Sequence, residues 1–191
     1  MDKKTLRKVY IARRKVFSSQ NISQESLRVL SILEGLPIWD KRCYHIFLPL
    51  RKFNELDTYP IVKRLFALGK KVVTTRSDFY NFSMQACLLT INTPLQLNTY
   101  GIPEPLEEVQ VNPFLIDVVF VPLLAFDNEG YRVGYGKGFY DRFFTICRSK
   151  ILKIGLSLFG PIRQISDRNT MDIPLDIAVC PDKVYRFKNL V

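Results

Sequence analysis

The chain has 191 residues, with 28 Lys and Arg against 18 Asp and Glu, and its formal net charge is +10. This length suits one ordinary domain or two small ones, and no stretch approaches the about 18 consecutive apolar residues of a membrane-spanning helix. The charge favours an anionic ligand, whereas four widely spaced cysteines and one histidine argue against a structural zinc site and are typical of a reduced, cytoplasmic protein.

The N-terminal third predicts two helices. Apolar residues recur at helical spacing along the first helix, on a face made of Leu6, Val9, Tyr10, Arg13, Val16 and Phe17. Another side of its first two turns is basic, with Lys4, Arg7 and Lys8. A second helix is expected to begin at Ser23 as N-cap and to end at Gly35.

The next segment predicts a strand, a helix and a second strand. The apolar run 43–48 is typical of a buried strand, and residues 71–75 have the same character. Between them, Thr58 followed by Pro60 predicts the start of a helix that ends before Gly69. A strand, helix and strand in this order imply a parallel pair.

Further strands are expected at residues 84–91, 116–121, 153–157 and 177–180, and a loop of turn-forming residues at 101–105. Strands alternate with helices over most of the chain, without repeats or a linker. We therefore expect an α/β fold: one domain, residues 1–191, with a mainly parallel central sheet flanked by helices on both faces.

The most informative segment is residues 132–142, which follow the strand at 116–121 and a turn at 127–130. Its three alternating glycines remove side chains, so backbone N–H groups can approach a ligand closely. The apolar spacing after residue 138 predicts a helix, and a helix N-terminus favours anions.

Charged residues within this glycine segment predict a nucleotide phosphate site. Lys137 and Arg132 would add positive charge, and Asp141 could hold a divalent cation that bridges phosphates. A tight glycine hairpin with solvated charges is an alternative, because the spacing matches neither the dinucleotide fingerprint nor the P-loop. A nucleic-acid-binding module is another, although the basic residues are dispersed along the chain.

Several segments resemble one known family. The run 132–142, preceded by Pro122, Ala125-Phe126-Asp127 and Gly130, resembles the signature of the 5-formyltetrahydrofolate cyclo-ligase family, also called 5,10-methenyltetrahydrofolate synthetases. Residues 3–7, 55–58 and 102–105 resemble, in order, the family's Lys-x-x-Leu-Arg, Glu-x-Asp/Glu-Thr and Glu-Pro elements. Order and spacing agree over nearly the whole chain.

The resemblance implies a ring closure that depends on ATP and Mg²⁺. The formyl oxygen of 5-formyltetrahydrofolate would attack the γ-phosphate, and N10 would then close the ring as phosphate leaves. The substrate would be a reduced folate, with or without a polyglutamate tail, and the enzyme a cytoplasmic monomer without nucleic-acid or membrane partners. A relative that uses ATP on another small formyl or amide compound remains an alternative.

The resemblance also implies roles for particular residues at the nucleotide. Lys137 and Arg132 would be catalytic, and Asp141 with Asp172 would hold Mg²⁺. The residues expected around ATP are Lys3, Lys4, Arg7, Arg132, Gly134, Tyr135, Gly136, Lys137, Gly138, Phe139 and Tyr140.

On the folate side, the resemblance implies that Glu55 accepts hydrogen bonds beside Leu50, and that Phe139 and Tyr140 stack on the pterin or shape its pocket. The chain departs from the family pattern at residues 74–76, at 171–172 and at 179–181. These departures concern the substrate-side walls and the C-terminal segment more than the glycine segment.

Overall fold

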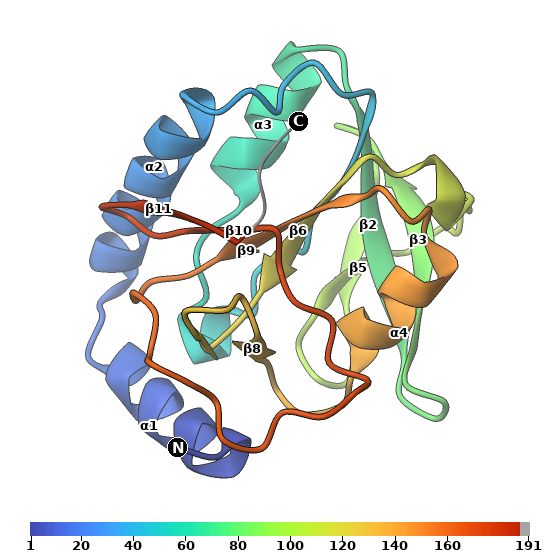
Figure 1. The fold of residues 1–191 in the computed structure, drawn as a ribbon. Coiled ribbons are helices and arrows are strands. Elements are labelled where there is room, and N and C mark those ends of the chain that lie inside the picture. Colours follow the sequence, from blue (N-terminus) through green and yellow to red (C-terminus); the bar gives the residue numbers. More distant parts are fainter. Residues whose placement is uncertain (188–191) are drawn as a thin grey trace.

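A seven-stranded sheet in the order β11-β10-β9-β6-β1-β2-β3 forms the centre of the computed structural model, which describes residues 1–187 (Figure 1). The five inner strands are parallel: β10 (Ile177–Val179), β9 (Leu152–Leu156), β6 (Val118–Pro122), β1 (Cys43–His45) and β2 (Lys71–Asp78). Antiparallel strands form the two edges, β11 (Val184–Arg186) and β3 (Ser83–Leu89). Two small hairpin sheets pair β4 (Leu95–Leu97) with β5 (Pro103–Pro105), and β7 (Ala125–Phe126) with β8 (Arg132–Val133).

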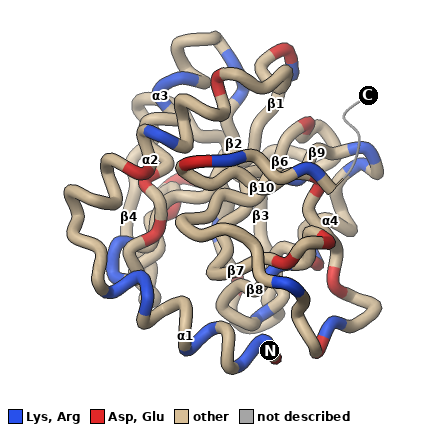
Figure 2. Tube along the Cα trace, turned by 60° about the vertical axis from the view of Figure 1, so that its left-hand side comes forward, with Lys and Arg blue, Asp and Glu red and all other residues tan. Residues whose placement is uncertain are grey.

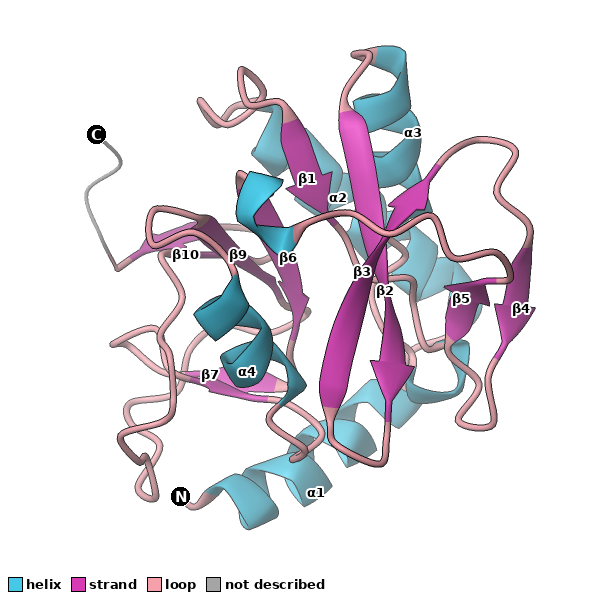
Figure 3. Cartoon of the chain, turned by 90° about the vertical axis from the view of Figure 1, so that its right-hand side faces the viewer, coloured by secondary structure: helices cyan, strands magenta, loops and turns pink. Residues whose placement is uncertain are grey.

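Helices cover both faces of this sheet (Figure 3). They are α1 (Lys3–Lys15), α2 (Ser19–Glu34), α3 (Tyr59–Ala67) and α4 (Phe139–Ile146), with short 3-10 helices at Arg51–Phe53 and Pro113–Leu115. Alternate residues of each inner strand face opposite sides: Tyr44 joins the core under α2 and α3, whereas Cys43 joins the core under α4. The predicted α/β fold and the parallel pair of β1 and β2 are therefore confirmed.

Three local predictions were wrong. Helix α2 begins after Ser18 rather than at Ser23, because the Ser18 and Asn21 side chains each bond the other's backbone N–H in a capping box. The first strand ends at His45 rather than at Leu48, although the backbone of Ile46 still donates to Val73 O at 2.8 Å. Part of the expected loop at 101–105 is strand β5, whose prolines occupy a two-stranded sheet with open edges that tolerates missing N–H groups.

The buried face of α1 also differs from the expected one. Leu6, Tyr10 and Arg14 are buried, four residues apart, whereas Arg13 and Val16 are exposed. The helix therefore turns a charged side chain, and not only apolar ones, toward the rest of the protein. Within residues 1–187, no helix is both long and apolar enough to cross a bilayer.

The chain's single histidine makes stability sensitive to acid. His45 lies fully buried against the rings of Tyr140 and Phe143, and burial lowers its pKa to about 3. In the unfolded chain the histidine pKa is about 6.5, so the unfolded state binds the proton more tightly than the folded state does. The contribution of neutral His45 to the free energy of unfolding is therefore fully present above about pH 6.5 and is lost as the pH falls toward 3. We expect the free energy of unfolding to fall by about 2 kcal/mol between roughly pH 7.5 and 5.

Urea unfolding at a series of pH values measures this loss. His45→Leu removes the titrating ring, so its unfolding free energy should vary much less over the same interval. An equal loss in both proteins would assign the acid sensitivity to other groups.

Candidate active site

A large cavity lies at the carboxyl ends of β1 and β6. The chain leaves β1 toward α3 on one face of the sheet and leaves β6 toward α4 on the other, although the two strands are neighbours. Open α/β sheets bind ligands at such a switch of direction. The cavity volume of about 1120 Å³ lies just above the roughly 300–1000 Å³ typical of a small-molecule site.

Every site residue expected from the sequence lines this one cavity. The N-terminal helix, the loop after β1, the glycine loop (residues 134–138) and the segment before β10 converge there, although they are far apart in sequence. The expected residues on its wall are Lys3, Lys4, Arg7, Leu50, Glu55, Arg132, Gly134, Tyr135, Gly136, Lys137, Gly138, Phe139, Tyr140, Asp141 and Asp172.

The glycine loop connects β8 to α4 and packs closely against α1. Gly136 and Gly138 have φ angles of +100° and +67°, which L side chains rarely adopt, and Gly138 is the N-cap of α4. Arg7 donates from Nε to the backbone oxygen of Gly134 at 2.9 Å. A Cβ atom at Gly136 would come within 3.0 Å of the Arg7 guanidinium, so glycine is needed here for close approach.

Positive charge accumulates around this loop. Helix α1 carries several basic residues and no acidic one between Lys3 and Lys15 (Figure 2). Lys4, Arg7 and Lys137 line the cavity, and none forms an ion pair with a carboxylate of the described chain. Unpaired cations beside a glycine loop at a helix N-terminus suit a polyanion such as a chain of phosphates.

Two carboxylates reach the cavity, each held through one oxygen. Asp141 Oδ1 accepts from Arg132 Nη2 at 2.8 Å and from the backbone of Ile173 at 3.0 Å. Asp172 Oδ2 accepts from Lys3 Nζ at 2.5 Å and from a backbone N–H at 2.8 Å. The second oxygen of each aspartate makes no hydrogen bond to residues 1–187.

These free oxygens fit a hard divalent cation, which prefers carboxylate and phosphate ligands. Within the described chain, no group of three or more His, Cys, Asp or Glu side chains could hold a metal by itself. A cation here would therefore need ligands from a bound phosphate or from water. The sequence indicated the two aspartates but not their pairing with Lys3 and Arg132.

The arginine that precedes the glycine loop is tied to the protein. Arg132 is mostly buried, and its guanidinium donates to Asp141 and to the backbone oxygen of Ile173. These contacts join β8, α4 and the segment before β10. Lys137, in contrast, is exposed, and its Nζ lies 4.9 Å above the ring of Phe82.

A buried carboxylate, Glu55, also lines the cavity. Glu55 accepts from the backbone N–H of Leu50 at 2.8 Å and from the Tyr135 hydroxyl at 2.7 Å. Burial raises the pKa of this carboxyl group, and both hydrogen bonds oppose that effect. The contact with Tyr135 joins the loop after β1 to the glycine loop between β8 and α4, a connection that the sequence did not reveal.

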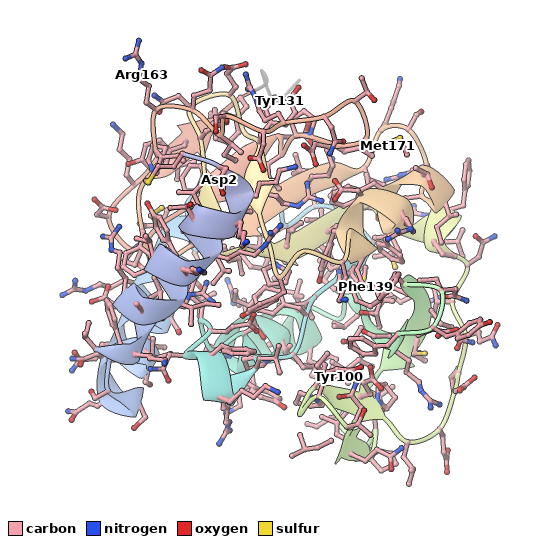
Figure 4. The ribbon with its side chains drawn as sticks, turned by 90° about the horizontal axis from the view of Figure 1, so that it is seen from below. Asp2, Tyr100, Tyr131, Phe139, Arg163 and Met171 are labelled. Atoms are coloured by element: carbon pink, nitrogen blue, oxygen red, sulfur yellow. The ribbon has the colours of Figure 1, made fainter. Side chains whose placement is uncertain are left out.

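Aromatic side chains close the cavity beside β2 and β3. Phe79 stacks on Tyr100 with ring centroids 3.7 Å apart and meets Phe139 edge-on at 5.2 Å. Phe139 and Tyr100 are both labelled in Figure 4, in which the molecule is seen from below. Thr74 and Thr75 continue this wall, and Met171 and Asp172 also line the cavity, so two of the three departures from the family pattern lie at the site. Nothing in the sequence marked Phe79 or Tyr100, because turn residues show no periodicity.

The chain is similar to known proteins over most of its length. The model of the 5-formyltetrahydrofolate cyclo-ligase family matches residues 1–181. A Mycoplasma genitalium protein named 5-formyltetrahydrofolate cyclo-ligase is 30% identical over 170 residues, which are 83% of this chain and 98% of that protein. An Escherichia coli (strain K12) protein of the same name is 34% identical over 140 residues, covering 70% and 76% of the two chains.

A solved structure agrees with these sequence relatives. The NMR structure of Aquifex aeolicus 5,10-methenyltetrahydrofolate synthetase superposes with a TM-score of 0.83 at 30% identity, and the match covers 100% of this chain and 95% of that one.

Proposed function

The chain belongs to the 5-formyltetrahydrofolate cyclo-ligase family and is a ligase with that activity; from this premise we propose that ATP drives its reaction, with Mg²⁺ as cofactor. The observation that carries the proposal is the set of cations around the glycine loop, Lys4, Arg7 and Lys137, which line one large cavity and form no ion pair within residues 1–187. Residues 1–191 would act as one cytoplasmic domain and as a monomer.

In the proposed reaction, the formyl oxygen of 5-formyltetrahydrofolate attacks the γ-phosphorus of ATP, and the bond to the ADP oxygen breaks. N10 then attacks the activated formyl carbon and loses its proton, and the carbon–oxygen bond breaks to release inorganic phosphate. Both steps depend on charge and alignment, because negative charge spreads over phosphate oxygens that fixed donors must hold.

The glycine loop would hold the phosphates of ATP. Backbone N–H groups of residues 134–138 and the side chains of Lys137, Arg7 and Lys4 are the available donors, and Lys137 is the free cation within the loop itself. Arg132 would act mainly by fixing the loop and Asp141, since its guanidinium already donates to Asp141 and Ile173.

The folate would lie between Glu55 and the aromatic wall. The Glu55 carboxylate would accept hydrogen bonds from the pterin, near Leu50, while Phe139 and Tyr140 contact its flat ring. A polyglutamate tail, if present, would meet Lys52 and Arg142, which also line the cavity and form no ion pair within residues 1–187.

The cofactor proposal predicts an effect of Asp141→Asn. Mg²⁺ would supply charge neutralisation of the phosphates, with Asp141 and Asp172 as its protein ligands. Asparagine can still accept the bond from Ile173 but carries no charge, so the Mg²⁺ concentration at half-maximal rate should rise about tenfold or more. Asp40→Asn, at an exposed position, is the matched control. An unchanged Mg²⁺ titration in Asp141→Asn would remove this carboxylate from the metal site.

The overall proposal is tested by the absorbance of methenyltetrahydrofolate. Purified protein, 5-formyltetrahydrofolate and Mg²⁺ should produce this band only after ATP is added, with one ADP formed per product. A band that forms equally well without ATP would overturn the role of the nucleotide. ATP binding without any product would instead favour another formyl or amide substrate.

A further inference from the structure

Behind the wall of the cavity lies a charged residue that the proposed reaction does not use. Arg14, near the end of α1, is only 3% exposed and does not line the cavity. Its Nη2 donates to the backbone oxygen of Leu123 at 2.5 Å, and its Nη1 donates to the Tyr135 hydroxyl at 3.4 Å. Burial of a guanidinium is unfavourable unless hydrogen bonds or an opposite charge compensate it, so the contacts of Arg14 should explain why an arginine is buried here.

The contacts of Arg14 lead directly to the substrate side of the site. The Tyr135 hydroxyl, which accepts from Arg14, donates to Glu55 Oε1 at 2.7 Å. Arg14, Tyr135 and Glu55 therefore form a chain of hydrogen bonds in which each member polarises the next. Tyr135 belongs to the glycine loop, so this series of hydrogen bonds joins α1, the glycine loop and Glu55.

A second contact fastens the same end of α1 beside Glu55. Asn54, which has a φ angle of +46°, donates from Nδ2 to the backbone oxygens of Arg14 and Phe17, each at 2.9 Å. Asn54 immediately precedes Glu55. The backbone beside Glu55 is thus held to the end of α1 directly, through Asn54, and its carboxylate is linked to Arg14 indirectly, through Tyr135.

The electrostatics of Glu55 depend on this arrangement. Burial raises its pKa, whereas the Leu50 N–H, the Tyr135 hydroxyl and the positive charge of Arg14 favour the carboxylate. Tyr135 and Tyr140 both sense this carboxylate, because the pKa of each is raised by burial and by the charge of Glu55. Glu55 forms no ion pair with a lysine or arginine of residues 1–187, and the positive charge that favours its carboxylate is that of Arg14.

We propose that Arg14 is a positioning residue for the folate half of the site, which holds the carboxylate of Glu55 in place through Tyr135. The proposal rests on the proposed role of Glu55 as the acceptor for the pterin. An ionised, fixed carboxylate accepts hydrogen bonds from ring N–H groups more strongly than a neutral acid does, because its acceptor oxygens carry the charge.

Arg14→Met tests the proposal, with Arg13→Met as the matched control on the same helix. Arg13 is exposed and lies over the rings of Tyr10 and Phe159, away from Glu55. We expect Arg14→Met to raise KM for 5-formyltetrahydrofolate about tenfold while changing KM for ATP by no more than about twofold. Loss of the cation favours protonation of Glu55, so the acid limb of kcat/KM for folate should move to higher pH. Arg14→Lys keeps the positive charge and should therefore return both KM for folate and the acid limb most of the way to their wild-type values.

A double-mutant cycle separates positioning from general support of the fold. In a Glu55→Gln background no carboxylate remains to be held, so Arg14→Met should change KM for folate little further. An equal rise in both backgrounds, or an unmoved acid limb, would overturn the proposal. If Arg14→Met does not fold, Tyr135→Phe removes the hydroxyl that links Arg14 to Glu55. An unmoved acid limb in Tyr135→Phe would also overturn the proposal. Wild-type protein without ATP-dependent product would refute the proposed function instead.

Discussion

Replacing Lys137 with alanine should lower kcat/KM for ATP-dependent ring closure by about a hundredfold or more while leaving the fold intact. The Lys137 ammonium lines the cavity without an ion pair in the described chain, so its charge is available to the phosphates. Within residues 1–187 the ammonium also makes a cation–π contact with Phe82, and at an exposed position such a contact contributes only about 0.5–1 kcal/mol. Steady-state kinetics and a thermal melt measure the two effects.

Lys150→Ala is the control for this variant. Lys150 is exposed and does not line the cavity, so its loss removes the same charge from the surface without touching the site. Equal losses of activity in the two variants would mean that activity depends on the net positive charge of the protein rather than on a specific contact of Lys137. A collapse of the melting transition in Lys137→Ala would mean that the loop needs this lysine for folding.

Gly136→Ala should also impair the use of ATP, but by changing the backbone and the position of Arg7 rather than by removing a charge. The φ angle of +100° disfavours any side chain, and the new Cβ would lie 3.0 to 3.2 Å from the guanidinium of Arg7. We expect this clash to displace Arg7 from its bond to Gly134 O and to raise KM for ATP at least about tenfold. Nucleotide binding measured by calorimetry reports the loss directly.

Gly69→Ala separates backbone strain from the clash. Gly69 has a φ angle of +63°, lies after α3, and a Cβ there would meet no atom within 4 Å. That variant should lose about 1–2 kcal/mol of stability without losing ATP binding. Normal ATP binding in Gly136→Ala would show instead that the Arg7 side chain can move away from the new methyl group without weakening the binding of ATP.

The sequence was informative where periodicity or spacing reflects local physics. Strand β6 was predictable because it is buried on both faces, and α3 because Thr58 and Pro60 mark its start. The start of α2 was not, since Ser18 and Ser23 both suit an N-cap and the capping partner, Asn21, is not the usual Glu or Gln.

Within the site, the residues could be predicted one by one but their partners could not. Lys3 and Asp172 are 169 positions apart, and Tyr135 and Glu55 are 80 apart, so only the folded sheet brings them together. Arg14 escaped detection for a related reason: on a basic helix, the apolar spacing pointed to Arg13, and only tertiary packing shows which arginine is buried.

The position of α1 has a consequence for how the enzyme is made. On the ribosome this helix emerges before its partners: Arg7 precedes Gly134 by 127 residues and Lys3 precedes Asp172 by 169. The N-terminal half of this cationic helix therefore cannot complete its docking until almost the entire polypeptide has been synthesised, although Asn54, a partner of its C-terminal end, is made much earlier. Stalled or truncated translation products would expose it to the polyanions of the cell, and nascent-chain proteolysis should find α1 among the last elements to become protected.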